Sequence, residues 1–325
     1  IIAMANYKEI QGFPIQNLSS DPVPYAQELA NNPYVGSWSS GGSLNTARSS
    51  IGGAGIQTAA LAFGGDVPGN TNATEEYDGS SWTAGGNMGT ARRLLAGCGT
   101  QTAGLAIGGF IAAVTDAVEE YDGSSWTAGG ALSTARRSLA AAGIQTAALA
   151  FGGIDTAATG ATEEYNGSSW TAGGTLGTAR GSLAGSGTQT AGLAFGGYTT
   201  TQSGATEEYD GSTWTAGGTM NTARSILAGC GTQTAALAFG GTTGSVTGAT
   251  EDYDGTSWTE VADLATSRAY LGGAGTNTLA LAFAGEVPPV TGATEEWAFS
   301  GLPPSTPAAG YSDAIIGQMY YNSTT

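Results

Sequence analysis

The phrase ATEEYDGSSW at 73–82 recurs along this chain at a fixed step of 44 residues. Its aromatic position falls at Tyr77, Tyr121, Tyr165, Tyr209, Tyr253 and, in the last copy, Trp297. No insertion or deletion interrupts the period across the six units. A regular period of this length is typical of solenoids, propellers and arrays, in which each unit buries its apolar surface against its neighbours.

Each unit reads as four short strands, which in the second copy cover 92–99, 102–109, 117–121 and 125–130. The Asp-Gly pair before the fourth strand is a strong hairpin signal. Helices are disfavoured because every segment is short, rich in Gly and Thr and bounded by turn residues. Two more positions keep the same step. They are an arginine, at Arg48, Arg92, Arg136, Arg180, Arg224 and Arg268, and an apolar residue before a Gly-Gly or Ala-Gly pair, at Phe63, Ile107, Phe151, Phe195, Phe239 and Phe283.

The second strand of the unit predicts how the sheets pack. In TAALAF at 58–63, Leu61 and Phe63 point to one face and Ala60 and Ala62 to the other. Both faces are apolar, one bulky and one small, so both must be covered. A radial stack of sheets does this when the bulky face of one blade meets the small face of the next. The expected fold is therefore all-β, a β-propeller closed into a ring.

Closure of the ring explains why the last copy lacks its tryptophan. The fourth strand carries Trp82, Trp126, Trp170, Trp214 and Trp258, but nothing equivalent follows Trp297. The segment GSWSSGG at 36–42 stands alone, with Trp38 placed 44 residues before Trp82. We expect 36–42 to complete the blade whose other strands lie at 269–299. The sequence thus predicts six blades, with an N-terminal strand closing the last.

The unit resembles the kelch repeat. The resemblance rests on a Gly-Gly pair after an apolar strand, a Tyr about a dozen residues later, a Trp five beyond it and an Arg ten after that. It covers residues 36–299 and implies a kelch-like propeller in which the repeated arginines tie neighbouring blades. WD40 repeats have a similar period, but their Gly-His and Trp-Asp pairs are absent here.

Composition excludes several classes of function. The net charge is −17, with 26 acidic residues against nine basic ones, which argues against nucleic acid and anionic membranes as partners. No apolar run is long enough to span a bilayer, and IIAMANYKEI lacks the features of a signal peptide. There are no histidines and two cysteines, so we expect no metal site and no cofactor. Cys98 and Cys230 occupy a slot that otherwise holds Ala or Ser, and we interpret both as reduced, buried and inert.

Paired carboxylates recur in every unit, at Glu75/Glu76, Glu119/Glu120, Glu163/Glu164, Glu207/Glu208, Glu251/Asp252 and Glu295/Glu296. Neighbours on a strand point to opposite faces, so they cannot act as the facing acids of a glycosidase. Sixfold copying also indicates a structural role, since catalysis needs one asymmetric constellation. We predict salt bridges, with the repeated arginine as partner, and solvation at the blade edge.

Candidate binding residues are those that break the repeat. The loop between the second and third strands keeps a length of seven residues but varies in content, as in DVPGNTN at 66–72 and FIAAVTD at 110–116. It should emerge on the same face as the loop joining two blades, and binding residues tend to lie on loops held by a rigid scaffold. We therefore select Phe110, Ile111 and Tyr198, with the off-pattern Arg93 and Arg137. Relaxed constraint on the loops, and solubility for the arginines, are the alternatives.

The flanks do not follow the repeat, so we divide the chain into an N-terminal extension at 1–35, the propeller at 36–301 and a Pro/Gly-rich linker with the start of another segment at 302–325. NYKEIQGFPIQNLSSDP and GQMYYNSTT resemble segments of tail-fibre and related virion proteins of bacteriophages, especially marine ones. That resemblance implies a particle-anchoring role, with other virion proteins as partners of residues 4–35 and 302–325.

The leading hypothesis is a non-enzymatic virion structural protein of a tailed phage, assembled in the bacterial cytoplasm. It would be a fibre or surface appendage whose propeller adheres to a host-surface glycan or protein. A bacterial secreted or cell-surface lectin-like propeller is the alternative. An enzyme is a third hypothesis, but copper oxidases of the kelch-like group need histidine ligands. The acids that break the repeat, Asp66, Asp116, Asp155 and Glu286, show no catalytic pairing.

Overall fold

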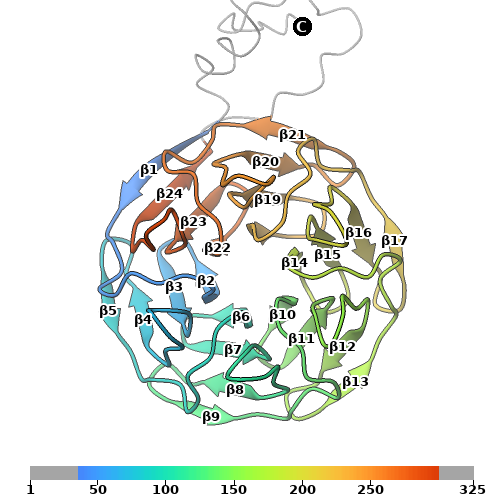
Figure 1. Ribbon diagram of the computed structural model, residues 1–325, viewed down its shortest axis with the longest axis horizontal. Coiled ribbons are helices and arrows are strands. Elements are labelled where there is room, and N and C mark those ends of the chain that lie inside the picture. The colour runs from blue at the N-terminus through green and yellow to red at the C-terminus, as the bar shows by residue number, and fades with distance from the viewer. Residues whose placement is uncertain (1–35, 300–325) are drawn as a thin grey trace, which may run out of the picture. The chain divides into compact units, whose positions relative to one another are not determined.

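Six four-stranded antiparallel sheets form a closed ring in the computed structural model, which describes residues 36–299 (Figure 1). Residues 1–35 and 300–325, with the flanking segments predicted there, lie outside the described residues. The first strand of each blade lies nearest the axis and the last at the rim. The sequence prediction of a six-bladed β-propeller with 44-residue repeats is confirmed.

The blades follow the repeat in chain order. Blade 1 contains β2 (Gly52–Ile56), β3 (Ala59–Phe63), β4 (Thr74–Tyr77) and β5 (Trp82–Ala84), and blade 2 contains β6 (Ala96–Thr100), β7 (Ala103–Ile107), β8 (Val118–Tyr121) and β9 (Trp126–Ala128). Blade 3 contains β10 (Ala140–Ile144), β11 (Ala147–Phe151), β12 (Thr162–Tyr165) and β13 (Trp170–Ala172), and blade 4 contains β14 (Ala184–Gly187), β15 (Gly192–Phe195), β16 (Thr206–Tyr209) and β17 (Trp214–Ala216). Blade 5 contains β18 (Ala228–Gly231), β19 (Ala236–Phe239), β20 (Thr250–Tyr253) and β21 (Trp258–Val261), and blade 6 contains β22 (Gly272–Gly275), β23 (Leu279–Phe283), β24 (Thr294–Ala298) and β1 (Ser37–Gly41).

The N-terminal strand β1 closes the ring, as the sequence predicts. It pairs antiparallel with β24, with Trp38 opposite Trp297 and Ser37 opposite Ala298. The two tryptophan rings lie 5.4 Å apart, and the Trp38 indole donates to Thr250 of blade 5 at 3.2 Å. Both ends of the ring are therefore held in one sheet, so no blade is left without its outer strand.

The core lies between blades, where bulky side chains of one sheet meet small ones of the next. Leu61 and Phe63 of β3 pack in one cluster with Ala106 of β7 and Tyr121 of β8. The predicted alternation of bulky and small faces is thus confirmed. Close to the axis the backbones approach so tightly that a Cβ on Gly97 would lie 2.5 Å from the carbonyl oxygen of Gly53. Only glycine fits at that point without displacing the neighbouring strand.

Each blade also contains a buried ion pair between the repeated arginine and the first acid of the pair. In blade 2, Arg92 donates to Glu119 at 2.6 Å, and both side chains are almost wholly shielded from solvent. The pair lies within one blade, whereas the Arg92 carbonyl accepts a 2.9 Å hydrogen bond from Gly65 of blade 1. The arginine therefore ties neighbouring blades through its backbone and stabilises its own blade through its guanidinium.

The second acid of the pair connects adjacent blades. The Tyr121 hydroxyl of blade 2 donates to Glu76 of blade 1 at 2.5 Å. Equivalent contacts join Tyr77 to Glu296, Tyr165 to Glu120, Tyr209 to Glu164, and Tyr253 to Glu208. The predicted structural role of the paired carboxylates is confirmed, although the first acid of each pair is buried inside the blade and is not solvated at its edge.

Candidate functional site

One face of the ring carries all the loops whose content varies. In blade 2, Arg93, which precedes the first strand, forms a backbone bridge with Phe110, which follows the second strand. The same bridge recurs in every blade, so the blade-joining loops and the variable loops emerge together, as expected. We call this the loop face. It comprises residues 66–72, 110–116, 154–160, 198–204, 242–248 and 286–292 with the blade-joining segments 42–51, 85–95, 129–139, 173–183, 217–227 and 262–271.

A closed circle of backbone hydrogen bonds surrounds the axis on this face. One non-glycine residue of each blade adopts a left-handed conformation with φ between 53° and 58°. The N–H of each donates to the carbonyl of the equivalent residue in the preceding blade, at 2.8–3.1 Å. We call these residues the axial ring. They are Ser50, Leu94, Ser138, Ser182, Ile226 and Tyr270.

The axial ring corrects one strand boundary. The sequence predicts a strand over 92–99, but β6 begins at Ala96. Leu94 has φ of 55°, which no strand residue adopts, so the chain turns there before it enters the sheet. Left-handed backbone costs about 1–2 kcal/mol for a residue with a Cβ. The six hydrogen bonds between blades hold this conformation in place at every copy.

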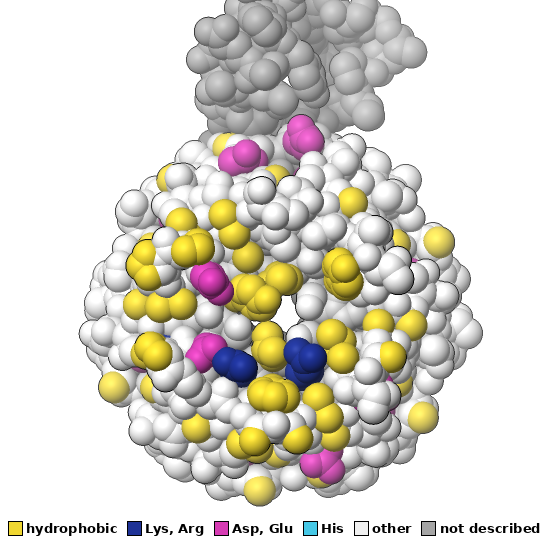
Figure 2. All heavy atoms as spheres, in the orientation of Figure 1, with side chains coloured by type: hydrophobic (Ala, Val, Ile, Leu, Met, Phe, Trp, Pro, Cys, Tyr) yellow, Lys and Arg dark blue, Asp and Glu magenta, His cyan; other side chains and the backbone are white. Residues whose placement is uncertain are grey.

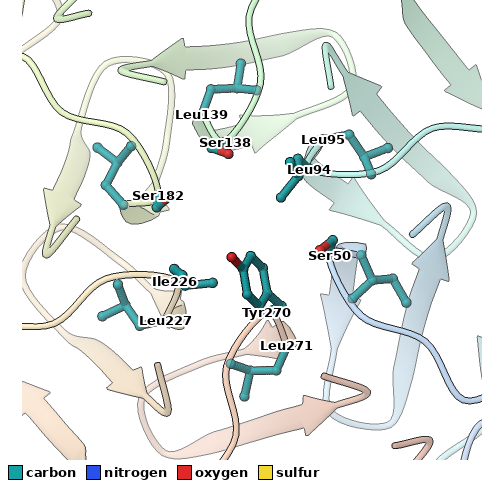
Figure 3. A pocket seen from close by; sticks show the side chains of 12 residues that line it. Ser50, Leu94, Leu95, Ser138, Leu139, Ser182, Ile226, Leu227, Tyr270 and Leu271 are labelled. Carbon is teal, nitrogen blue, oxygen red and sulfur yellow. The ribbon is translucent and has the colours of Figure 1, made fainter. Parts of the chain in front are cut away.

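The axial ring lines a cavity of about 100 Å³ at the mouth of the central opening (Figure 3). The backbone is equivalent in all six blades, but the ring side chains are three serines, two aliphatic residues and one tyrosine. The leucine or isoleucine that follows each of them completes the wall. Figure 3 shows Tyr270 extending from blade 6 into the cavity. The repeat therefore builds one asymmetric pocket from symmetric backbone.

Two arginines and a phenylalanine cluster beside this opening. The guanidinium carbons of Arg93 and Arg137 lie 5.5 Å and 5.6 Å from the centroid of the Phe110 ring. Arg93 also forms an ion pair with Asp66 of blade 1. None of the ion pairs among residues 36–299 involves Arg137. We call Arg93, Phe110 and Arg137 the rim cluster.

Charge is concentrated at this part of the loop face. Figure 2 shows basic side chains beside the central opening. Among residues 36–299, Arg93 and Arg137 are the arginines that are not fully buried. Burial raises the pKa of the Tyr270 hydroxyl, and the nearby Glu286 raises it further, while Arg137 and Arg93 lower it. The Tyr270 hydroxyl therefore lies in the combined electrostatic field of one carboxylate and two guanidinium groups.

The structure brings together three of the five predicted site residues, namely Arg93, Arg137 and Phe110. Ile111 is next to them, and its side chain is 42% exposed. Tyr198 is 44% exposed but lies in the variable loop of blade 4, bridged to Gly181, and does not join the cluster. Sequence reasoning missed Tyr270, although its departure from the Ser or aliphatic residue of the other copies was a visible signal.

No group of three His, Cys, Asp or Glu side chains within residues 36–299 could hold a metal ion. Cys98 and Cys230 are free and buried, as predicted, and burial raises the pKa of the Cys98 thiol to about 12. No helix among the described residues is long and apolar enough to cross a membrane.

Comparison with known proteins adds no identification: no protein-family model matches the chain, and no curated protein matches it significantly.

Proposed function

We propose that this protein is a non-enzymatic adhesion protein, a fibre or surface appendage of a tailed-phage virion that presents its propeller to a host-surface glycan or protein. The observation that carries the proposal is the contrast within each repeat. The backbone of the axial ring is equivalent in all six copies, while its side chains and those of the variable loops differ. A rigid scaffold with one diversified face is an arrangement that suits binding.

Rigidity of the scaffold supports this proposal. Every blade has a buried Arg–Glu pair, and five blade interfaces are joined by a tyrosine hydroxyl on a carboxylate. Side chains on such a frame lose little conformational freedom when a ligand binds, which favours affinity. These contacts also engage the repeated carboxylates in structural roles, which supports a non-enzymatic function.

Two resemblances in the sequence support the finer parts of the proposal. The spacing of Gly-Gly, Tyr, Trp and Arg is similar to that of kelch repeats. Residues 4–35 and 302–325 resemble segments of phage tail-fibre proteins, and we propose that they attach the chain to other virion proteins. Both segments lie outside the described residues.

Electron microscopy of the native source tests the virion assignment. Particles would be labelled with an antibody against this chain, and six-bladed discs should appear at symmetry-related positions on a phage. Discs found free or on cell envelopes would contradict the virion assignment. They would favour the alternative, a bacterial surface or secreted lectin-like propeller, which uses the same loop face.

Glycan-array binding by the full chain tests adhesion separately. We expect binding that is reduced by changes on the loop face, such as Tyr198→Ala, Ile111→Ser or Arg137→Ser. Thr127→Ala serves as the control because Thr127 is exposed on β9 at the outer rim of blade 2. Equal loss with this control would show that binding does not depend on the loop face. If the chain binds neither a glycan nor whole host cells, the adhesion proposal fails.

A further inference from the structure

We infer that the rim cluster, together with Tyr270, forms a subsite for the carboxylate of an acidic sugar. This inference rests on the proposed function, because it names the chemical class of ligand that the loop face would bind. Arg137 would hold the carboxylate. Tyr270 and the serines of the axial ring would meet the hydroxyl groups beside it.

The accessible cations of the described propeller lie together in the rim cluster. Six of the eight arginines between residues 36 and 299 are fully buried against a glutamate of their own blade. The other two, Arg93 and Arg137, both lie on the loop face against one phenylalanine. In a chain of net charge −17, this concentrates the accessible positive charge of the described propeller at one point. An anionic group is the ligand that such a point attracts.

Arg137 is held in place without a carboxylate partner among residues 36–299. The Phe110 ring supports its guanidinium at 5.6 Å, and its backbone is fixed by the bridge to Ile154. Its side chain takes part in none of the ion pairs among residues 36–299. A guanidinium presents a planar fork of donors that matches a carboxylate with two parallel hydrogen bonds. Arg137 is therefore a pre-positioned donor, whereas Arg93 is already paired with Asp66.

The lining of the neighbouring cavity favours a sugar acid as the carrier of the carboxylate. The adjoining cavity of about 100 Å³ is lined by Ser50, Ser138, Ser182 and Tyr270 together with aliphatic residues. That volume is well below the roughly 300–1,000 Å³ of pockets for drug-sized ligands, so it suits the substituents of one ring, with the rest of a glycan outside. Glu286 and Asp66 lie nearby, which disfavours a polyanion such as a polyphosphate. A ligand with one carboxylate beside several hydroxyl groups fits this subsite, and uronic and sialic acids are of this kind.

Ligand-observed NMR on the full chain tests this subsite with glucuronate, galacturonate and N-acetylneuraminate, against glucose and galactose. We expect at least one acid to bind and the neutral sugars to bind about tenfold more weakly or not at all. Arg137→Ser should weaken binding of that acid about 10- to 100-fold, as expected for a charge-assisted pair. The variant should fold, because Ser49 and Ser225 occupy the same backbone position in blades 1 and 5. Tyr270→Phe should give a smaller loss, and Thr127→Ala none.

Several outcomes would overturn the inference. They are failure of all three acids to bind, equal binding of acids and neutral sugars, or unchanged affinity in Arg137→Ser. Inorganic phosphate or sulfate competing as well as the sugar acid would show a general anion site and would also overturn the sugar assignment. If neutral glycans bind through the loop face while no acid does, the adhesion proposal stands and only this inference fails.

Discussion

Asn277 donates a hydrogen bond of 3.2 Å to the carboxylate of Asp252 across the interface between blades 5 and 6. The other five interfaces have a glutamine here, which reaches two backbone carbonyls of the preceding blade, as Gln101 does with Ala60 and Tyr77. This interface also has Asp252 in place of glutamate and Trp297 in place of tyrosine, and the Trp297 indole donates to the Asn277 carbonyl at 2.9 Å. Three residues that depart from the repeat thus replace its usual hydrogen bonds with contacts to one another at a single interface.

Asp252 should make the stability of the protein depend on pH. Burial raises the pKa of Asp252 from 3.8 to about 6, and Asn277 opposes the shift. Between these values the folded protein retains a proton that the unfolded chain has released. The contribution of Asp252 is therefore fully present below pH 4 and is lost as the pH rises through 6.

Urea denaturation across pH 3–8 measures this effect in the wild type and in Asp252→Asn, whose amide does not titrate. The difference in free energy of unfolding, wild type minus variant, should fall as the pH rises from about 4 to 6 and stay level outside that window. A difference independent of pH would show that Asp252 titrates normally.

Adjacent arginines should differ sharply in their contribution to stability. Arg92 is wholly buried against Glu119, so Arg92→Met leaves a buried carboxylate without its partner and should cost about 3–5 kcal/mol. Arg93 pairs with Asp66 with 35% of its side chain exposed, so Arg93→Ser should cost about 1 kcal/mol or less. Chemical denaturation of both variants gives the comparison. Similar losses would mean that burial does not set the strength of these pairs.

The axial ring should tolerate glycine better than its native residues. Ser182 has φ of 55°. Ser182→Gly should stabilise the folded state by removing about 1–2 kcal/mol of backbone strain. The greater conformational freedom of glycine in the unfolded chain should offset about 0.5–1 kcal/mol of this gain. We expect the free energy of unfolding to rise by about 0.5–1 kcal/mol. Ser182→Ala retains the strain and is the control, which should show no gain. Destabilisation by glycine would indicate that the ring is not strained.

Both thiols should be unreactive in the folded protein. Burial raises the pKa of Cys98 to about 12, and burial together with Asp252 raises that of Cys230 as well. Because the thiolate is the reactive form, a thiol reagent at pH 8 should label neither residue until denaturant is added. Rapid labelling of the native protein would contradict the burial of these side chains.

The strand pattern could be predicted because each copy of the repeat shows it in the local alternation of its side chains. The alternation in TAALAF assigned Leu61 and Phe63 to one face, and the 44-residue step then placed that face against the next blade. The closing strand followed from Trp38, which keeps the step of the other tryptophans. These signals depend on period and side-chain size, which a sequence displays directly.

The axial ring could not be predicted, because its cause is not local. Leu94 and Ile226 are residues that normally avoid left-handed backbone, and no glycine marks the turn. Hydrogen bonds between equivalent residues 44 positions apart impose the conformation. The contact between Arg137 and Phe110 could not be predicted for a similar reason. It links the blade-joining segment 129–139 to the variable loop 110–116 of blade 2.

The pairing of β1 with β24 also determines how the propeller responds to tension. Ser37 lies opposite Ala298 at the same end of this antiparallel pair, so a force applied at residues 36 and 299 would separate the two strands one residue pair at a time. Such peeling loads the hydrogen bonds singly, whereas shear would load them together. A propeller pulled through residues 36 and 299 would therefore open first at blade 6, at low force, while blades 1–5 kept their sheets intact.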